Sequence, residues 1–103
     1  MHIVIFITCA KKSEALSIAD NLISRKLAAC VNIADNIKSV FRWQGKVDRA
    51  KEILLIVKSK KSKLTRIIKL VRLLHSYKVP EIIALPVISG YKPYLEWIDE
   101  SIR

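Results

Sequence analysis

The middle of the chain reads Arg42-Trp43-Gln44-Gly45-Lys46, and apolar, strand-like sequence flanks this stretch on both sides. Gly45 is one of only two glycines, and glycine takes a positive φ at no steric cost. Gln44-Gly45 is therefore the expected point of chain reversal, and we predict a long β-hairpin with Trp43 beside its tip. A large ring in that position is poorly placed to reach the core of its own small domain. Burial by another subunit is the natural alternative.

The composition predicts a single globular domain over residues 1–103, because 51% of the residues are hydrophobic and glycine and proline total only five. No apolar run approaches the roughly 20 residues of a membrane span. The apolar start lacks the basic region of a signal peptide, so we expect a cytoplasmic protein. Cys9 and Cys30 form no CxxC pair and no zinc-ribbon spacing. We expect both to be free thiols in a reducing compartment.

On the N-terminal side of the hairpin, the near-continuous apolar run 2–9 predicts a central strand. Apolar residues at spacings of three and four then predict an amphipathic helix that ends near Arg25 and has Ser13 as its N-cap. The next apolar run, 27–43, predicts a long strand that is bent or bulged near Asp35-Asn36.

On the C-terminal side, the third strand is expected to end at Lys58, and a second helix to follow Ser62 as its N-cap. Residues 81–88 predict a fourth strand, in which Pro86 requires an edge position or a bulge. Pro93 then begins a short terminal helix. The order predicts an α+β, ferredoxin-like βαββαβ fold: a four-stranded antiparallel sheet with two helices on one face, plus the C-terminal helix.

In this fold the second sheet face has no cover from the same chain. Its apolar residues, together with Phe41 and Trp43 on the hairpin, need a partner.

The net charge of +10 is the least explained property of the composition. Lysines and arginines cluster over residues 58–72, on the second helix and its approach. A basic helix face can bind nucleic acid or acidic lipid. Base-stacking aromatic residues are not interleaved with these charges, although nucleic-acid platforms require them. We therefore favour a solvated face and expect neither a nucleic-acid nor a membrane partner, and keep a nucleic-acid-binding module as an alternative.

No catalytic motif is present: the chain has no phosphate-binding glycine loop, no G-x-S-x-G and no H-E-x-x-H, and its acids are few and scattered. We expect no enzyme. Thiolate and imidazole suit copper and zinc, and Cys9 and His75 lie at ends of elements that this fold can bring together. They are the candidate metal ligands. For His75 the alternative role is to cap the helix or to form a hydrogen bond with Glu81. We expect Cys30 in the core and His2 on the surface.

Four blocks of sequence, in order and across essentially the whole chain, resemble the CutA family of divalent-cation tolerance proteins. They are Ala29-Cys30-Val31-Asn32-Ile33, Ser39-Val40-Phe41-Arg42-Trp43-Gln44-Gly45-Lys46, Leu74-His75-Ser76-Tyr77-Lys78-Val79-Pro80-Glu81-Ile82-Ile83-Ala84-Leu85-Pro86-Val87 and Tyr94-Leu95-x-Trp97. The resemblance implies a ferredoxin-like protomer in a tight homotrimer, a response to copper and other divalent metals, and no established reaction. The family is similar in architecture to the trimeric PII signalling proteins. This implies an alternative, a small anion sensed in the cleft between subunits, where Lys58 would supply charge.

The chain departs from the family pattern at four places. The metal-binding cysteine that some members place late in the first strand falls at Ile7 or Thr8 here, and the second histidine beside the turn in some members is Leu74. The usual His-Pro-Tyr-Glu turn reads His75-Ser76-Tyr77-Lys78, and the usually acidic stretch 47–52 has lost most of its negative charge. Among the proposed family ligands only His75 is matched, so we expect weak binding of Cu(II) or another divalent cation. The pocket residues that the resemblance carries over are Trp43, Lys58, Tyr77 and Glu81, and we add Phe41 as a fifth pocket or interface residue.

Overall fold

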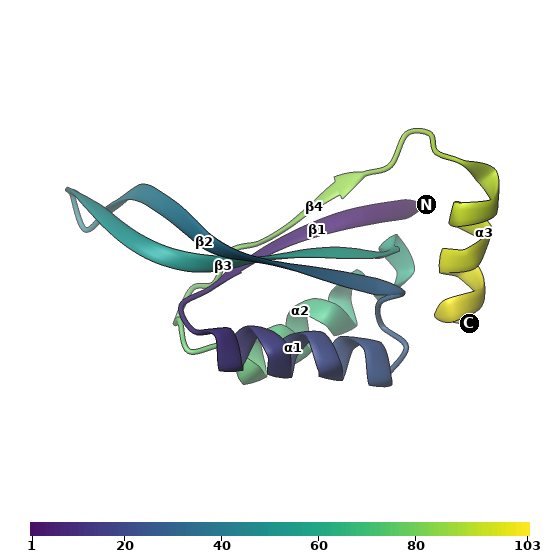
Figure 1. The fold of residues 1–103 in the computed structure, drawn as a ribbon, viewed down its shortest axis with the longest axis horizontal. Helices are drawn as coiled ribbons and strands as arrows, with labels where there is room; N and C mark the ends of the chain where they lie inside the picture. The colour runs from purple at the N-terminus through teal and green to yellow at the C-terminus, as the bar shows by residue number, and fades with distance from the viewer.

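Four antiparallel strands and three α-helices make up the computed structural model, which describes residues 1–103. The sheet has the order β2-β3-β1-β4. Helices α1 and α2 cover one of its faces, whereas α3 lies at the end of the sheet beside the N-terminus (Figure 1). The predicted ferredoxin-like α+β fold is confirmed. The elements are β1 (His2–Cys9), α1 (Lys12–Ser24), β2 (Cys30–Trp43), β3 (Lys46–Lys60), the 3-10 turn η1 (Lys61–Lys63), α2 (Leu64–Leu74), β4 (Ile82–Pro86) and α3 (Lys92–Ser101).

The hairpin of β2 and β3 turns where the sequence predicts. Gln44 and Gly45 both have positive φ, 51° and 78°, the pattern of a type I′ turn, whose twist matches that of the two strands. Pairing runs from Trp43↔Lys46 at the tip to Cys30↔Lys58, with a bulge between Ala34 and Ile37. The predicted bend is thus confirmed.

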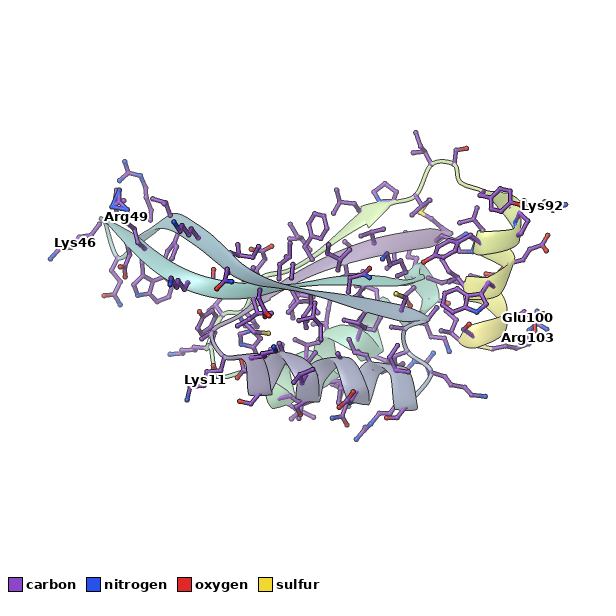
Figure 2. All side chains as sticks on the ribbon, viewed as in Figure 1. Lys11, Lys46, Arg49, Lys92, Glu100 and Arg103 are labelled. Carbon is purple, nitrogen blue, oxygen red and sulfur yellow. The ribbon has the colours of Figure 1, made fainter.

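The outer part of this hairpin is a two-stranded arm. β1 pairs with β3 only from Ile53 to Lys60, so residues 37–52 pair only with one another. The arm projects beyond the rest of the sheet, and Lys46 and Arg49 lie at its end (Figure 2). Without a third strand or a helix to cover it, the arm lacks the packing that normally stabilises a hairpin.

The covered face of the sheet forms the core. Alternate residues of β1 and β3 point toward α1 and α2 and are buried, and fully burying one such aliphatic side chain contributes about 1.5–3 kcal/mol. The central members are Ile5, Ile7, Leu55 and Val57 from the strands, and Ile18, Leu22, Ile67 and Val71 from the helices.

The open face of the sheet is also apolar. Its central apolar residues, from β1, β3 and β4, are Val4, Phe6, Leu54, Ile56, Ile83 and Leu85. On the edge strand β4, Ile83 is 52% exposed and Leu85 is 43% exposed. Asp99 of α3 contacts His2 and Lys60 at one end of this face, and α1 and α2 lie on the other side of the sheet. The prediction that this face lacks cover from its own chain therefore holds only in part.

Several predicted boundaries are wrong by a few residues. Helix α1 begins at Lys12 after Lys11, and α2 follows Lys63, so neither Ser13 nor Ser62 is an N-cap. Ser62 lies inside η1, which already turns the chain into the helix. β3 continues to Lys60 because its pairing with β1 persists to His2. β4 ends at Pro86, on the predicted sheet edge.

No helix of the chain has the length and apolar character needed to cross a membrane.

Candidate functional site

A small polar cluster lies inside the covered layer, where β1 ends. Cys9 is the last residue of β1, Glu14 lies in the first turn of α1, and His75 follows the last residue of α2. One potential ligand atom from each lies within 4.8 Å of the others. The predicted approach of Cys9 and His75 is therefore found. Glu14 was not predicted; its only signal was its place in the first turn of the helix that follows Cys9.

His75 has both ring nitrogens in hydrogen bonds to the backbone. Nε2 donates to the carbonyl oxygen of Thr8 at 2.7 Å, and Nδ1 accepts from the amide of Tyr77 at 3.0 Å. This pattern requires the neutral imidazole with its proton on Nε2. The expected alternative of a hydrogen bond to Glu81 is wrong, because these backbone groups are the ring's partners. His75 thus ties the end of α2 to the end of β1.

Glu14 supplies the unsatisfied group of the cluster. Its Oε1 accepts from the amide of Ser76 at 2.6 Å, but Oε2 is buried without any hydrogen-bond partner. Oε2 lies 3.8 Å from Nδ1 of His75, and the Glu14 side chain is only 12% exposed. A buried carboxylate oxygen normally finds a donor or a cation. A cation bound beside Oε2 of Glu14 would therefore satisfy this oxygen.

The thiol of Cys9 is held in its neutral form. Burial raises the pKa of Cys9 to about 12, and the charges of Glu14 and Glu52 act in the same direction. Sulfur, imidazole nitrogen and carboxylate oxygen are a donor set that copper and zinc accept. A metal bound here would displace the proton of the Cys9 thiol. It would also break the hydrogen bond from the Tyr77 amide to Nδ1 of His75. The residues thus fit a divalent metal, but the loss of this proton and of this hydrogen bond would make the binding free energy less favourable.

A second candidate is a groove of about 780 Å³ between the arm and the connection that follows α2. It brings together four of the five predicted pocket residues: Phe41, Trp43, Tyr77 and Glu81. Trp43 remains 53% exposed in the single chain, as expected for a ring beside a hairpin tip. The other lining residues are Thr8, Ser39, Val40, Asp48, Glu52, Ser76, Lys78 and Val79.

The groove is acidic, although the chain as a whole is basic. Three carboxylates and a single lysine line it. The hydroxyl of Tyr77 donates to Oε2 of Glu52 at 2.9 Å, and burial together with this bond raises the pKa of Tyr77 to about 12. Lys58, the fifth predicted pocket residue, does not line the groove, and its amine donates to Asn32. Within one chain, this charge pattern disfavours an anion.

Two further sequence predictions are corrected by the structure. Cys30 is half-buried on the open face of the sheet and is not a core residue, because it pairs with Lys58 at the start of β2. His2 is not freely exposed. Its Nε2 lies 2.8 Å from Oδ1 of Asp99 and 3.2 Å from the carbonyl oxygen of Leu95, and these contacts join β1 to α3.

Comparison with known proteins gives a consistent result. The model of a family described as CutA1 divalent ion tolerance protein matches residues 3–101. The divalent-cation tolerance protein CutA of Archaeoglobus fulgidus is 45% identical over 103 residues, which cover all of both chains. The solved structure of the periplasmic divalent cation tolerance protein CutA from the same organism superposes with a TM-score of 0.96 over all of both chains, at 45% identity.

Some relatives are longer than this chain. The CutA homolog of Xenopus laevis is 40% identical over 97 residues, and the match covers 94% of this chain and 64% of that protein. For chloroplastic CutA proteins of rice and Arabidopsis thaliana the corresponding shares of the relative are 57% and 56%.

Proposed function

The chain belongs to the CutA1 divalent ion tolerance family, and on that premise we propose a homotrimeric metal-tolerance protein that binds Cu(II), or another divalent cation, weakly at Cys9, Glu14 and His75. The observation that carries the proposal is Oε2 of Glu14, which is buried, has no partner and faces a thiol and an imidazole. Leaving a buried acceptor unsatisfied costs about 1–3 kcal/mol, and more when it is charged. A bound cation would offset that cost.

The same geometry makes the binding weak. A metal must compete with the Tyr77 amide for the lone pair on Nδ1 of His75. It must also remove the proton of Cys9, and each pH unit below a pKa of about 12 lowers the thiolate fraction about tenfold. Only Glu14 offers a ligand atom that is free at neutral pH.

The proposed role is binding without catalysis. Cysteine, histidine and carboxylate are also the composition of a thiol-based catalytic triad. Here the side chain of Cys9 is fully buried, its pKa is raised to about 12, and both nitrogens of His75 hold backbone groups. A nucleophile needs an accessible thiolate and a free base. These observations speak against a reaction at this cluster.

The proposed trimer rests on the open face and the arm. Six apolar side chains of β1, β3 and β4 lie on the open face, which α1 and α2 do not cover and which α3 contacts only at one end. Phe41, Trp43 and Val47 add exposed apolar surface along the arm. Contiguous patches of this kind are typical of subunit interfaces. The two free thiols are compatible with the proposed cytoplasmic location.

Two measurements test the proposal. Light scattering on the tag-free protein should give three times the chain mass of 11.8 kDa, and a monomer at micromolar concentration would end the trimer model. A thermal-shift screen should compare divalent metals with nucleotides and organic anions. Cu(II) and Zn(II) are expected to raise the melting temperature of the parent slightly.

The matched variants for this screen are Glu14→Gln and Glu96→Gln. In Glu14→Gln the new side chain can still accept the Ser76 amide proton through its carbonyl oxygen, but it loses the charge that would hold a cation. Glu96 is an exposed residue of α3 that lies far from the cluster in sequence and contacts Lys92. The metal response should fall in Glu14→Gln and persist in Glu96→Gln. Equal responses in both variants would place any metal elsewhere.

A further inference from the structure

The positive charge of the chain is concentrated in one segment. Residues 53–80 contain eight lysines and arginines and no acid, so they carry +8 of the net +10. The structure places most of these charges on η1, on α2 and on the connection to β4. Helix α2 buries Ile67, Leu70 and Val71 in the core, so its cations lie on the outer side. The basic face of α2 is defined here as Lys61, Lys63, Arg66, Lys69, Arg72 and Lys78.

These six cations have no acidic partner within the chain. The lysines and arginines that form salt bridges are Lys12, Lys60, Lys92 and Arg103. The start of α2 also has no acid in its first turn, while Lys61 and Lys63 immediately precede it. Cations at a helix N-terminus oppose the helix dipole. The arrangement therefore costs stability within the chain, and a bound anion would offset that cost.

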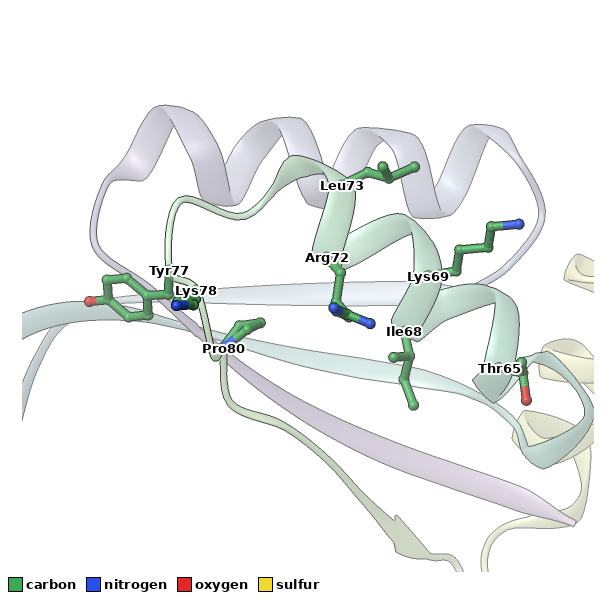
Figure 3. Close-up of a pocket in the computed structure, with 8 residues that line it drawn as sticks. All are labelled: Thr65, Ile68, Lys69, Arg72, Leu73, Tyr77, Lys78 and Pro80. Atoms are coloured by element: carbon green, nitrogen blue, oxygen red, sulfur yellow. The ribbon is translucent and has the colours of Figure 1, made fainter. Parts of the chain in front are cut away.

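Two adjoining grooves hollow the basic face. The larger, of about 630 Å³, lies between α2 and the connection to β4, and Lys69, Arg72 and Lys78 line it together with Thr65 (Figure 3). The smaller, of about 360 Å³, has Arg25, Arg66 and Lys69 in its wall. Lys69 belongs to both grooves, and no acidic residue lines either one. Their charge is opposite to that of the groove beside the arm.

We propose that the basic face of α2 binds a small anion that carries two or more phosphate groups, seated in the larger groove against Lys69, Arg72 and Lys78. The guanidinium group of an arginine matches phosphate oxygens in a bidentate manner, and lysine adds point charge. A volume of about 630 Å³ falls within the range of small-molecule sites. The face lies on the helix side of the sheet (Figure 1). It would therefore stay accessible if the open face were covered by other subunits.

Two macromolecular partners fit the face less well. A single-stranded nucleic acid needs several aromatic rings on which successive bases stack, but the larger groove has only Tyr77 and the smaller has no aromatic residue. An interfacial helix needs a broad apolar face to insert into a lipid surface, but α2 buries Ile67, Leu70 and Val71 in the core and leaves Leu73 as its one largely exposed apolar residue. A compact phosphate anion requires neither feature.

Inorganic tripolyphosphate is the probe, titrated calorimetrically into the full chain at about 50 mM and about 150 mM salt. We expect one saturable site per chain, weakened several-fold at the higher salt because the contacts are ionic. The double variant Lys69→Gln/Arg72→Gln should lose at least about tenfold in affinity, which corresponds to about 1.4 kcal/mol. The control Lys46→Gln/Arg49→Gln removes the same charge from the tip of the arm (Figure 2) and should lose less than about twofold. Circular dichroism checks that both variants fold.

Three outcomes would overturn the proposal. Absence of saturable binding at the lower salt would leave the basic face solvated. An equal loss in the two double variants would show a response to net charge alone. Binding of a single-stranded oligonucleotide or of phosphatidylglycerol vesicles without binding of tripolyphosphate would assign the face to a macromolecule.

Discussion

Both faces of the sheet carry large apolar side chains, but only the face under the helices is fully buried within the chain. Leu55 points to the helices and is 0% exposed, whereas its neighbour Leu54 lies on the open face and is only partly covered. The covered face finds its cover in α1 and α2 of the same chain. The open face continues onto the arm, where no third element packs. Apolar residues on both faces need to be buried. The chain topology places α1 and α2 on one face only, so the other face must be buried by a partner.

The largest expected effect is the loss of stability on substituting Leu55, and it should differ in kind from the effect of substituting Leu54. Leu55→Ala creates a cavity in a closed core and should reduce the free energy of unfolding by about 2–5 kcal/mol at any protein concentration. Leu54→Ala makes the same change one residue away on the open face. Its cost should depend on protein concentration, because it acts through assembly. Chemical denaturation at two concentrations measures both, and equal, concentration-independent losses would contradict the distinction between the faces.

A substitution of Trp43 tests whether the end of the arm takes part in assembly. Truncating an interface tryptophan typically costs about 2 kcal/mol or more, which weakens association about 30-fold. We therefore expect Trp43→Ala to dissociate at higher protein concentration than the parent, as measured by light scattering across a dilution series. Val40→Ala, also exposed on the arm but smaller, is the control. A Trp43→Ala variant that assembles and melts like the parent would show that the ring is only a surface residue.

The covered face was largely predictable from the sequence, and the reasons are local. Gln44-Gly45 fixed the turn, Asp35-Asn36 marked the bulge, and Pro86 required a sheet edge, because each of these residues restricts its own backbone. Ser13 and Ser62 misled because a serine favours an N-cap without enforcing it.

The candidate site was less predictable, because it depends on packing between distant elements. Cys9 and His75 were brought together by the expected fold, but Glu14 joins them only through the way α1 and α2 lie on the sheet. For Lys58 the error was the opposite, because the prediction included a residue that does not belong to the groove. The resemblance suggested Lys58 as a pocket residue, but the single chain places it away from the acidic groove. No local pattern encodes either outcome.

Alkaline pH tests how well the covered face excludes water around Cys9. The pKa of this thiol is raised from 9.0 to about 12 in the folded chain, so deprotonation favours unfolding. Its contribution to stability is complete below pH 9 and is lost as the pH rises from 9 toward 12, at about 1.4 kcal/mol per unit. The raised pKa of Tyr77 acts in the same direction above pH 10. Denaturation between about pH 8 and about pH 11 should therefore show a falling free energy of unfolding.

The control for the pH effect is the other thiol. Cys9→Ala should flatten the slope above pH 9, whereas Cys30→Ala, which removes a half-buried thiol on the open face, should leave it unchanged. The slopes are compared, not the absolute stabilities, because Cys9→Ala also leaves a small cavity. An unaltered slope in Cys9→Ala would mean that this thiol is not the group that titrates.

The smallest expected effect is that of metal on the buried cluster. A ligand stabilises the folded state by only about 0.4 kcal/mol when its free concentration equals its dissociation constant. Because Cu(II) must displace the Cys9 proton and the Tyr77 amide, we expect weak binding in calorimetry. The affinity should increase with pH, since the Cys9 thiol must release its proton to solvent before its sulfur binds the metal as a thiolate. His75→Ala should abolish most of the binding, but it also removes the hydrogen bond to Thr8. Glu14→Gln therefore serves as the variant that keeps this contact, and it should weaken Cu(II) binding as well. A stoichiometric site with a sub-micromolar dissociation constant, unchanged in both variants, would show that the metal ligands lie outside this cluster.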